Sequence, residues 1–184
     1  MKFRQLKAQE IEVRPAMVKE NGVALLLYKD ARVDQRILDE TVGAENWQRA
    51  HDVINGKLFC RVGIRVERGD MFEWVWKQDV GVPSNTEPVK GEASDSFKRA
   101  CTNWGIGREL YTAPFIWAEA DVKQVNNKWT TYDRFYVEQI VYSDGSIVAL
   151  SIKNQNNKRV FLMDNRPKEE EVNNDKNKQK RGKD

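Results

Sequence analysis

Long apolar runs, histidine and cysteine are what this 184-residue chain has least of. No stretch of about 18 consecutive apolar residues occurs, which excludes a membrane-spanning helix. The only histidine, His51, has no CxxC, HxxxH or HExxH spacing to accompany it, so we interpret it as a structural or surface residue rather than a metal ligand. The N-terminal residues carry charges throughout and lack the apolar core of a secretion signal, so we expect a cytoplasmic protein.

The two cysteines, Cys60 and Cys101, lie in segments with a regular apolar pattern. Two cysteines in such positions are more often buried thiols than a disulfide, and they favour a reducing compartment. Glycine-rich phosphate loops are missing too, because GIGREL (residues 105–110) fits neither the P-loop pattern nor the GxGxxG spacing. We therefore expect no nucleotide hydrolysis.

Charge of both signs is abundant, with 31 Lys and Arg against 28 Asp and Glu and a net charge of +3. The resulting pI of about 8.8 is only mildly basic, so binding to phosphate would require local clustering of the basic residues. The hydrophobic fraction of 40% and charged fraction of 32% are those of a soluble globular protein. The length suits one domain, which we place over residues 1–164.

Short-range patterns predict a hairpin and a helix near the N-terminus. An Asn-Gly pair between two apolar-rich arms predicts a β-hairpin over residues 11–28, since both residues tolerate positive φ. Residues 31–42 then carry apolar side chains at helical spacing. Asp30 stands at the N-cap position and Gly43 where a C-terminal glycine is common, so we expect a helix over 31–42.

Residues 46–82 predict a three-stranded antiparallel meander. An Asn-Gly pair at 55–56 and a Gly-Asp pair at 69–70 separate three extended runs. Alternation along the middle run sends apolar side chains to one face, which we expect to be core. The opposite face is then basic with an aromatic, and consists of Phe59, Arg61, Gly63 and Arg65.

The stretch GEASDSFKRACTNWG, residues 91–105, has the apolar spacing of an amphipathic helix. Pro88 is consistent with its start and Gly105 with its end. Its apolar residues can dock on the sheet, which leaves Lys98 and Arg99 on the remaining surface.

A connector follows, and residues 132–163 alternate apolar and polar side chains around an Asp-Gly turn and an Asn-rich turn, which predicts a second meander. Residues 165–184 contain a single aliphatic residue, Val172, and are predicted to be a disordered charged tail. The fold class is α+β, with an antiparallel hairpin and meander packed against helices, followed by the C-terminal meander and the tail.

Basic residues accompany aromatics in several of these elements, and such a set can follow a phosphate backbone while rings stack on bases. A lone surface charge is more often simply solvated, and Asp95 and Arg99 have the four-residue spacing of an ordinary helical ion pair. The candidates are Lys29, Arg32, Arg36, Arg61, Arg65, Lys77, Lys90, Lys98, Arg99 and Arg108.

Two alternatives stay open. A metal-dependent DNA-processing nuclease could use scattered carboxylates, although they form no recognisable acidic cluster in the sequence. A non-enzymatic structural or adaptor protein could assemble through its sheets, with an incidental basic face. The carboxylates considered are Asp30, Asp34, Asp39, Glu40, Asp79, Glu92 and Asp95.

Three stretches together resemble one family. ARVDQRILDETVGAENWQ has a helix followed by Gly43, a short spacer and Trp47. The first meander ends in the Asp-Val-Gly of QDVGV (78–82), and residues 91–105 carry Glu-Ala, then Asp, then a large apolar residue before Lys-Arg-Ala, and later aromatic-Gly. Over residues 23–111 the chain resembles the single-strand annealing proteins of the Rad52 superfamily, particularly its small phage and prophage recombinases.

The resemblance implies a β-sheet packed against helices, a ring or helical homo-oligomer, and a basic groove that holds single-stranded DNA extended. It implies annealing of complementary strands in homologous recombination and double-strand break repair, with no enzymatic activity and no nucleotide or other cofactor. A phage origin would place the protein in the cytoplasm of a bacterial host cell. The tail resembles charged ends that contact single-strand-binding proteins, and the C-terminal meander either completes the fold or forms subunit contacts.

Matched residue by residue, the Lys-Arg pair of the family's groove falls on Lys98 and Arg99. A basic residue of the preceding helix is matched by Arg32, displaced by one position. A further groove arginine falls on Thr102 and an aromatic of the spacer on Ala44, so the sequence departs from the family at both places. The predicted DNA-binding residues are Lys98, Arg99 and Arg32, with Arg36, Arg61, Arg65 and Lys90 added from the charge pattern.

Overall fold

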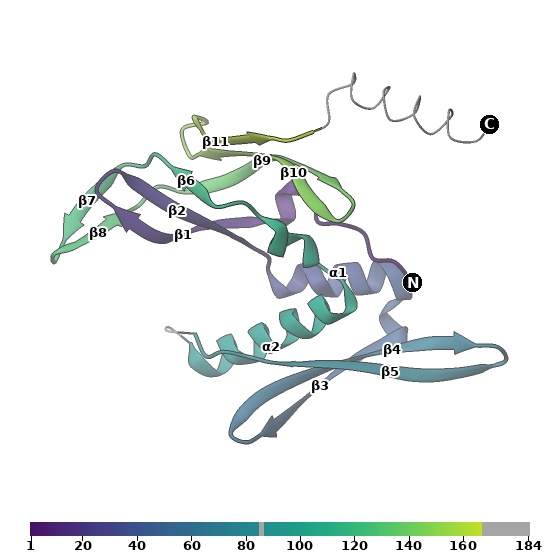
Figure 1. Cartoon of the computed structure of the whole chain (residues 1–184). Helices are drawn as coiled ribbons and strands as arrows, with labels where there is room; N and C mark the ends of the chain where they lie inside the picture. The colour runs from purple at the N-terminus through teal and green to yellow at the C-terminus, as the bar shows by residue number, and fades with distance from the viewer. Residues whose placement is uncertain (85–86, 167–184) are drawn as a thin grey trace, which may run out of the picture.

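A computed structural model describes residues 1–84 and 87–166, which form three layers (Figure 1). The lower layer is a three-stranded sheet of β3 (Trp47–Ile54), β4 (Lys57–Arg68) and β5 (Met71–Val80). The middle layer holds two helices, α1 (Ala31–Val42) and α2 (Pro88–Trp104). The upper layer is a six-stranded sheet in the order β11-β10-β9-β1-β2-β6. The predicted α+β class is confirmed.

The N-terminal hairpin and the first helix are both confirmed. Strands β1 (Glu12–Lys19) and β2 (Gly22–Tyr28) pair antiparallel, so the turn is Glu20-Asn21 and Gly22 already belongs to β2. The Asp30 side chain accepts a hydrogen bond of 2.7 Å from the Arg32 N–H, which satisfies one of the free donors at the start of α1.

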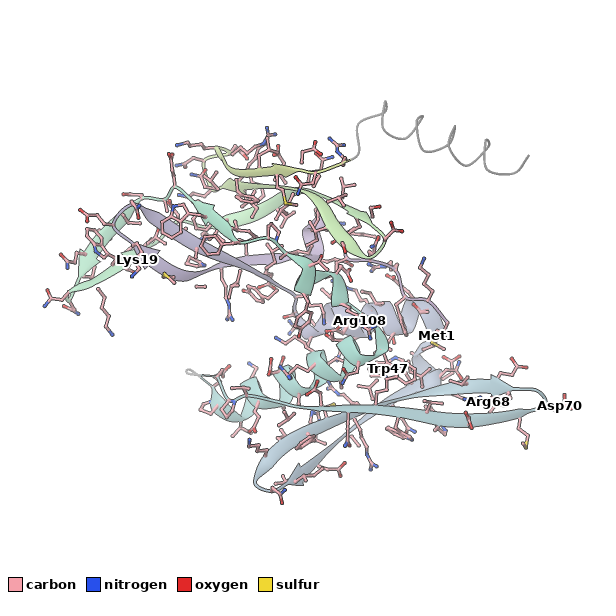
Figure 2. All side chains as sticks on the ribbon, viewed as in Figure 1. Met1, Lys19, Trp47, Arg68, Asp70 and Arg108 are labelled. Carbon is pink, nitrogen blue, oxygen red and sulfur yellow. The ribbon has the colours of Figure 1, made fainter. Side chains whose placement is uncertain are left out.

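The three-stranded meander is confirmed, including its turns. Asn55 and Gly56 both have positive φ, at 51° and 72°, as the tight hairpin turn requires. On β4 the side chains of Cys60, Val62 and Ile64 are fully buried on the face toward α2. The hairpin of β4 and β5 extends beyond the helices, with Arg68 and Asp70 at its tip (Figure 2).

The C-terminal meander completes the upper sheet. Its strands are β9 (Phe135–Ser143), β10 (Ser146–Asn154) and β11 (Arg159–Asp164), and β9 pairs with the start of β1. Strand β11 also comes into contact with β6 (Ile116–Ala118), so the six-stranded sheet curls until its two outer strands meet. The buried side chains of Val23, Leu25, Ile116, Leu150 and Ile152 belong to the core.

The predicted connector contains structure that short-range patterns did not indicate. It holds β6 and a separate hairpin of β7 (Val122–Val125) and β8 (Lys128–Thr131), besides a 3-10 helix at Arg108–Thr112. The turn of this hairpin is Asn126-Asn127, both with positive φ, rather than a more recognisable Asn-Gly pair. Two further 3-10 helices lie at Ala8–Glu10 and Ala44–Asn46.

Several smaller predictions can be compared with the structure. Cys60 and Cys101 are free thiols with no exposed surface, as predicted, and burial raises the pKa of Cys60 to about 11. His51 is exposed, with Nε2 3.3 Å from the Ala93 carbonyl oxygen. No helix in the described ranges is long and apolar enough to cross a bilayer. Of the predicted tail, Asn165 and Arg166 are described and residues 167–184 lie outside the described residues.

Helix α2 docks closely on the three-stranded sheet. Phe97, Ala100 and Cys101 are fully buried on its inner side, and the Trp104 Nε1–H donates to the Val62 carbonyl oxygen at 3.0 Å. At the end of β5, a Cβ on Gly81 would lie 2.2 Å from the Glu92 carbonyl oxygen of α2. The glycine of the QDVGV motif therefore permits the close approach of strand and helix.

A Gly81→Ala substitution is expected to destabilise the fold by about 1–3 kcal/mol, because the added methyl group overlaps helix backbone that cannot move independently. Urea denaturation measures the change in the free energy of unfolding. Gly69→Asn is the control, since the space around Gly69 is open and asparagine tolerates its φ of 60°. Equal stability of Gly81→Ala and wild type would show that α2 is not held this closely.

Candidate nucleic-acid interface

A groove of about 330 Å³ separates α2 from β2, and we call it the α2–β2 groove. It is the place where the middle layer faces the upper sheet (Figure 1). Helix α2 contributes Asp95, Lys98, Arg99 and Thr102, the end of β2 contributes Leu26, Leu27 and Tyr28, and Lys29 follows directly after the strand. The segment after α2 closes one end with Gly107, Leu110 and Tyr111.

Lys98 and Arg99 reach this groove because the other side of α2 is buried on the sheet. Arg99 is 41% exposed, and its Nε–H donates to an Asp79 carboxylate oxygen of β5 at 3.3 Å. It pairs with Asp79 rather than with Asp95, which instead accepts a hydrogen bond from the Val82 N–H. None of the ion pairs among the described residues includes Lys98, so its ammonium group is available to an anion in the groove.

Thr102 occupies the groove position at which the resemblance implies another arginine, and its hydroxyl donates to the Lys98 carbonyl oxygen at 3.1 Å. Lys29, which follows β2, also lines the groove, but its ammonium group is paired with Asp34. Its side chain passes so close to Gly107 that a Cβ there would lie 2.2 Å from the Lys29 Cε. Gly107 also has a φ of 68°, so both space and backbone conformation favour glycine at this position.

Lys29 and Asp34 form a buried ion pair beneath the groove. The Lys29 ammonium lies 2.6 Å from Asp34 Oδ2, with exposed fractions of 5% and 0% for the two side chains. Burial raises the pKa of Asp34 to about 6, and the positive charges of Lys29 and Lys98 oppose that rise. At neutral pH the carboxylate is therefore ionised, and the pair ties the end of β2 to α1.

An Asp34→Ala substitution is expected to cost about 3–5 kcal/mol of stability, because it leaves the Lys29 charge buried without a partner. The double variant Lys29→Met/Asp34→Leu removes both charges and should recover most of that loss. Urea denaturation at pH 7 measures both values. A double variant as unstable as the single one would show that charge pairing is not what the two residues contribute.

Two other predicted residues, Arg32 and Lys90, lie in a different hollow of about 490 Å³ between the starts of α1 and α2 and strand β3. Arg49 and His51 line the same hollow. The Arg32 and Lys90 side chains are 85% and 79% exposed. Arg32 pairs with Asp30 at 3.5 Å, and Lys90 pairs with Glu87 at 3.1 Å. Arg36 lines a third hollow together with Arg32, Glu12 and Asp39.

Arg61 and Arg65 lie on the face of the lower sheet that points away from α2, as the alternation of β4 predicts. The Arg61 guanidinium lies 5.2 Å from the centre of the Trp76 ring and 3.2 Å from an Asp52 oxygen. The Arg65 guanidinium lies 3.9 Å from the centre of the Phe72 ring. The structure thus brings Lys98 and Arg99 together and separates the remaining predicted residues from them.

The carboxylates that a nuclease would need are dispersed and occupied. Asp34 binds Lys29, Asp39 accepts a hydrogen bond of 2.6 Å from Trp47 Nε1, and the Glu92 side chain accepts one from the Leu58 N–H. No cluster of three or more His, Cys, Asp or Glu side chains suited to a metal ion occurs within residues 1–84 and 87–166. The carboxylate arrangement therefore gives the nuclease hypothesis no specific support.

Of the groove residues outside α2, sequence reasoning named Lys29 and missed the others. Tyr28 and Tyr111 line the groove and lie in segments interpreted as a hairpin arm and a connector. One signal was present, since residues 111–117 (YTAPFIW) concentrate aromatic side chains in a short stretch. Helix α2 ends beside this stretch, where the Arg108 guanidinium donates to the Thr102 and Asn103 carbonyl oxygens at 3.0 and 3.1 Å (Figure 2).

The fold and groove define an α+β protein with an open groove that has cationic side chains on one wall and aromatic rings on its margin. The family model of the Rad52/22 double-strand break repair proteins matches residues 4–129. The chain belongs to this family, as its helix and meander motifs predict.

Relatives in the comparison include two DNA-related proteins. The single-stranded DNA-binding protein DdrA of Deinococcus radiodurans is 31% identical over 118 residues, which cover 62% of this chain and 54% of DdrA. The mitochondrial genome maintenance protein MGM101 of Eremothecium gossypii is 31% identical over 124 residues, covering 61% of this chain and 43% of MGM101. The matched part of the chain thus spans about half the length of these relatives.

Proposed function

We propose that this protein binds single-stranded DNA in the α2–β2 groove and promotes its annealing to a complementary strand without a nucleotide cofactor. The observation that carries the proposal is the position of Lys98 and Arg99, the matched Lys-Arg pair, on one wall of an open groove. Membership of a double-strand break repair family and similarity to DdrA, a single-stranded DNA-binding protein, support the same function.

The groove would hold the strand by its phosphates. Lys98 and Arg99 neutralise phosphate charge, and the release of condensed counterions then supplies much of the affinity. Arg99 exchanges its contact with Asp79 for one with a phosphate, whereas Lys98 has no described ion pair to give up. Contacts to phosphate carry no sequence information, so binding is expected to be indifferent to sequence, as annealing of arbitrary strands requires.

The finer parts of this proposal rest on the family resemblance. They are an annealing core made of α1, the lower sheet and α2, a ring or helical homo-oligomer, an action without enzymatic bond chemistry, and a phage origin with a cytoplasmic location in the host. The proposed contact of residues 165–184 with a single-strand-binding protein falls mainly outside the described residues.

The double variant Lys98→Ala/Arg99→Ala is expected to bind single-stranded DNA about a hundredfold more weakly, or roughly tenfold for each charged contact, and to anneal complementary oligonucleotides correspondingly more slowly. Fluorescence anisotropy measures binding, and a stopped-flow annealing assay without nucleotide measures the rate. The matched control is Lys57→Ala/Lys128→Ala, which removes two charges at hairpin turns away from the groove lining.

Unchanged binding and annealing in a folded Lys98→Ala/Arg99→Ala protein would overturn the proposed role of the groove. Incubation of labelled DNA with magnesium tests the nuclease alternative in the same samples. Cleavage that a chelator abolishes would assign the protein to that class instead. Absence of any DNA binding at low salt would favour the structural or adaptor alternative.

A further inference from the structure

The wall of the α2–β2 groove opposite α2 is a face of the upper sheet. Alternation along β2 places Leu26 and Tyr28 on this face, and both line the groove. The alternate residues of β2 belong to the other face, where Val23 and Leu25 are buried in the core, although Leu27, near the end of the strand, also lines the groove. The last three residues of β2 therefore line the groove, and Leu26 and Tyr28 do so from the face that is turned away from the core.

The neighbouring strand β6 extends this face with aromatic rings. Trp117 pairs with Ala24, and a Cβ on Gly22 would lie 3.0 Å from Trp117 Nε1, so the indole covers the glycine on the groove side of β2. Phe115 precedes Trp117 by two residues and shares its face, and the two rings stack with centroids 6.4 Å apart and planes at 20°.

Most side chains of this surface are exposed, and Trp117 is half-buried. Phe115 is 74% exposed, Tyr111 is 73% exposed and Leu26 is 50% exposed. We call this surface the aromatic wall, and it consists of Leu26, Tyr111, Phe115 and Trp117. Leu26 and Tyr111 line the groove, and the stacked rings of Phe115 and Trp117 continue the sheet face that Leu26 belongs to, so this exposed apolar surface points to a binding partner.

We propose that the aromatic wall stacks the bases of the single strand whose phosphates lie along α2, an inference that rests on the proposed function and deepens it. The phosphates then contact Lys98 and Arg99 in the groove, whereas the bases contact the ring of Tyr111 in the groove lining and the ring of Phe115 on the adjoining sheet face. Stacking on aromatic rings is tolerant of sequence because every base has a π-face.

Charge complementarity favours a nucleic-acid strand over a second copy of the protein. A protein surface that covered the aromatic wall and filled the groove would also cover Lys98, which has no described carboxylate partner. Burying an unpaired charge is costly. Each nucleotide of a single strand carries both an anionic phosphate and a planar apolar base, so one strand can contact both sides of the groove. The stacked and paired bases inside a duplex expose no π-face to the wall.

A strand held by stacking also stays available for pairing. A base that stacks on Phe115 contacts the protein through its face, so its hydrogen-bonding edge is not consumed by protein groups. The complementary strand can then be read along the open side of the groove. Base pairing alone then selects the partner strand, and the protein holds and orders the first strand.

The test compares binding of two probes, an oligo-dT strand and an abasic strand of equal length, to the wild type and to Phe115→Ala. The wild type is expected to bind oligo-dT at least tenfold more tightly than the abasic strand, and Phe115→Ala should lose most of this preference while its affinity for the abasic strand stays within twofold. Phe115→Tyr retains a ring and should retain the preference. Phe72→Ala, which removes a 58% exposed ring from the outer face of the lower sheet, is the control and should keep it as well.

Several results would overturn the inference. Equal affinity of the wild type for both probes would show that the bases do not stack on the wall, and it would leave the proposed phosphate binding unaffected. An equal loss of affinity for both probes in Phe115→Ala would mean that Phe115 contacts the phosphates. A change of oligomeric mass in Phe115→Ala, without a change in the ratio of the two affinities, would mean that the wall is a subunit contact. Failure of the wild type to bind either probe would instead refute the proposed function itself. Lys98→Ala is the complementary variant, because it should weaken the binding of both probes by the same factor.

Discussion

The burial of one side of α2 on the lower sheet is the constraint on which the rest of the structure depends. Phe97, Ala100 and Cys101 have no exposed surface, and the strand end at Gly81 touches the helix backbone directly. A helix fixed in this way cannot rotate, so its other side, with Lys98, must face the upper sheet. The same packing that stabilises the core thereby turns an ordinary basic pair into one wall of a groove.

The opposite wall is set by an independent constraint at the end of β2. The buried ion pair of Lys29 and Asp34 holds this strand to α1, and Gly107 gives the lysine side chain the room to reach its partner. Strand register then carries the exposed rings of β6 to the same side. Two layers with separate reasons for their positions therefore meet at a space that is cationic on one side and aromatic on the other.

Much of this arrangement could be predicted from the sequence where the controlling forces are local. The hairpin turns, the N-cap at Asp30 and the apolar spacing of α2 depend on residues a few positions apart, and the corresponding elements are confirmed. The groove could not be predicted in the same way, because its walls come from residues about seventy positions apart and are matched by tertiary packing. Charge pattern alone likewise grouped Arg61 with Lys98, although they lie on different surfaces, since a pattern of charges does not reveal which face of a sheet a helix covers.

The central claim is that Lys98 makes a direct contact with a DNA phosphate. The most direct measurement is the salt dependence of single-strand binding for the wild type and Lys98→Ala, plotted as the logarithm of the affinity against the logarithm of salt concentration. Loss of one phosphate contact should make the slope shallower by roughly 0.7. Identical slopes for the two proteins would contradict the account, because they would mean that Lys98 releases no counterion when the strand binds.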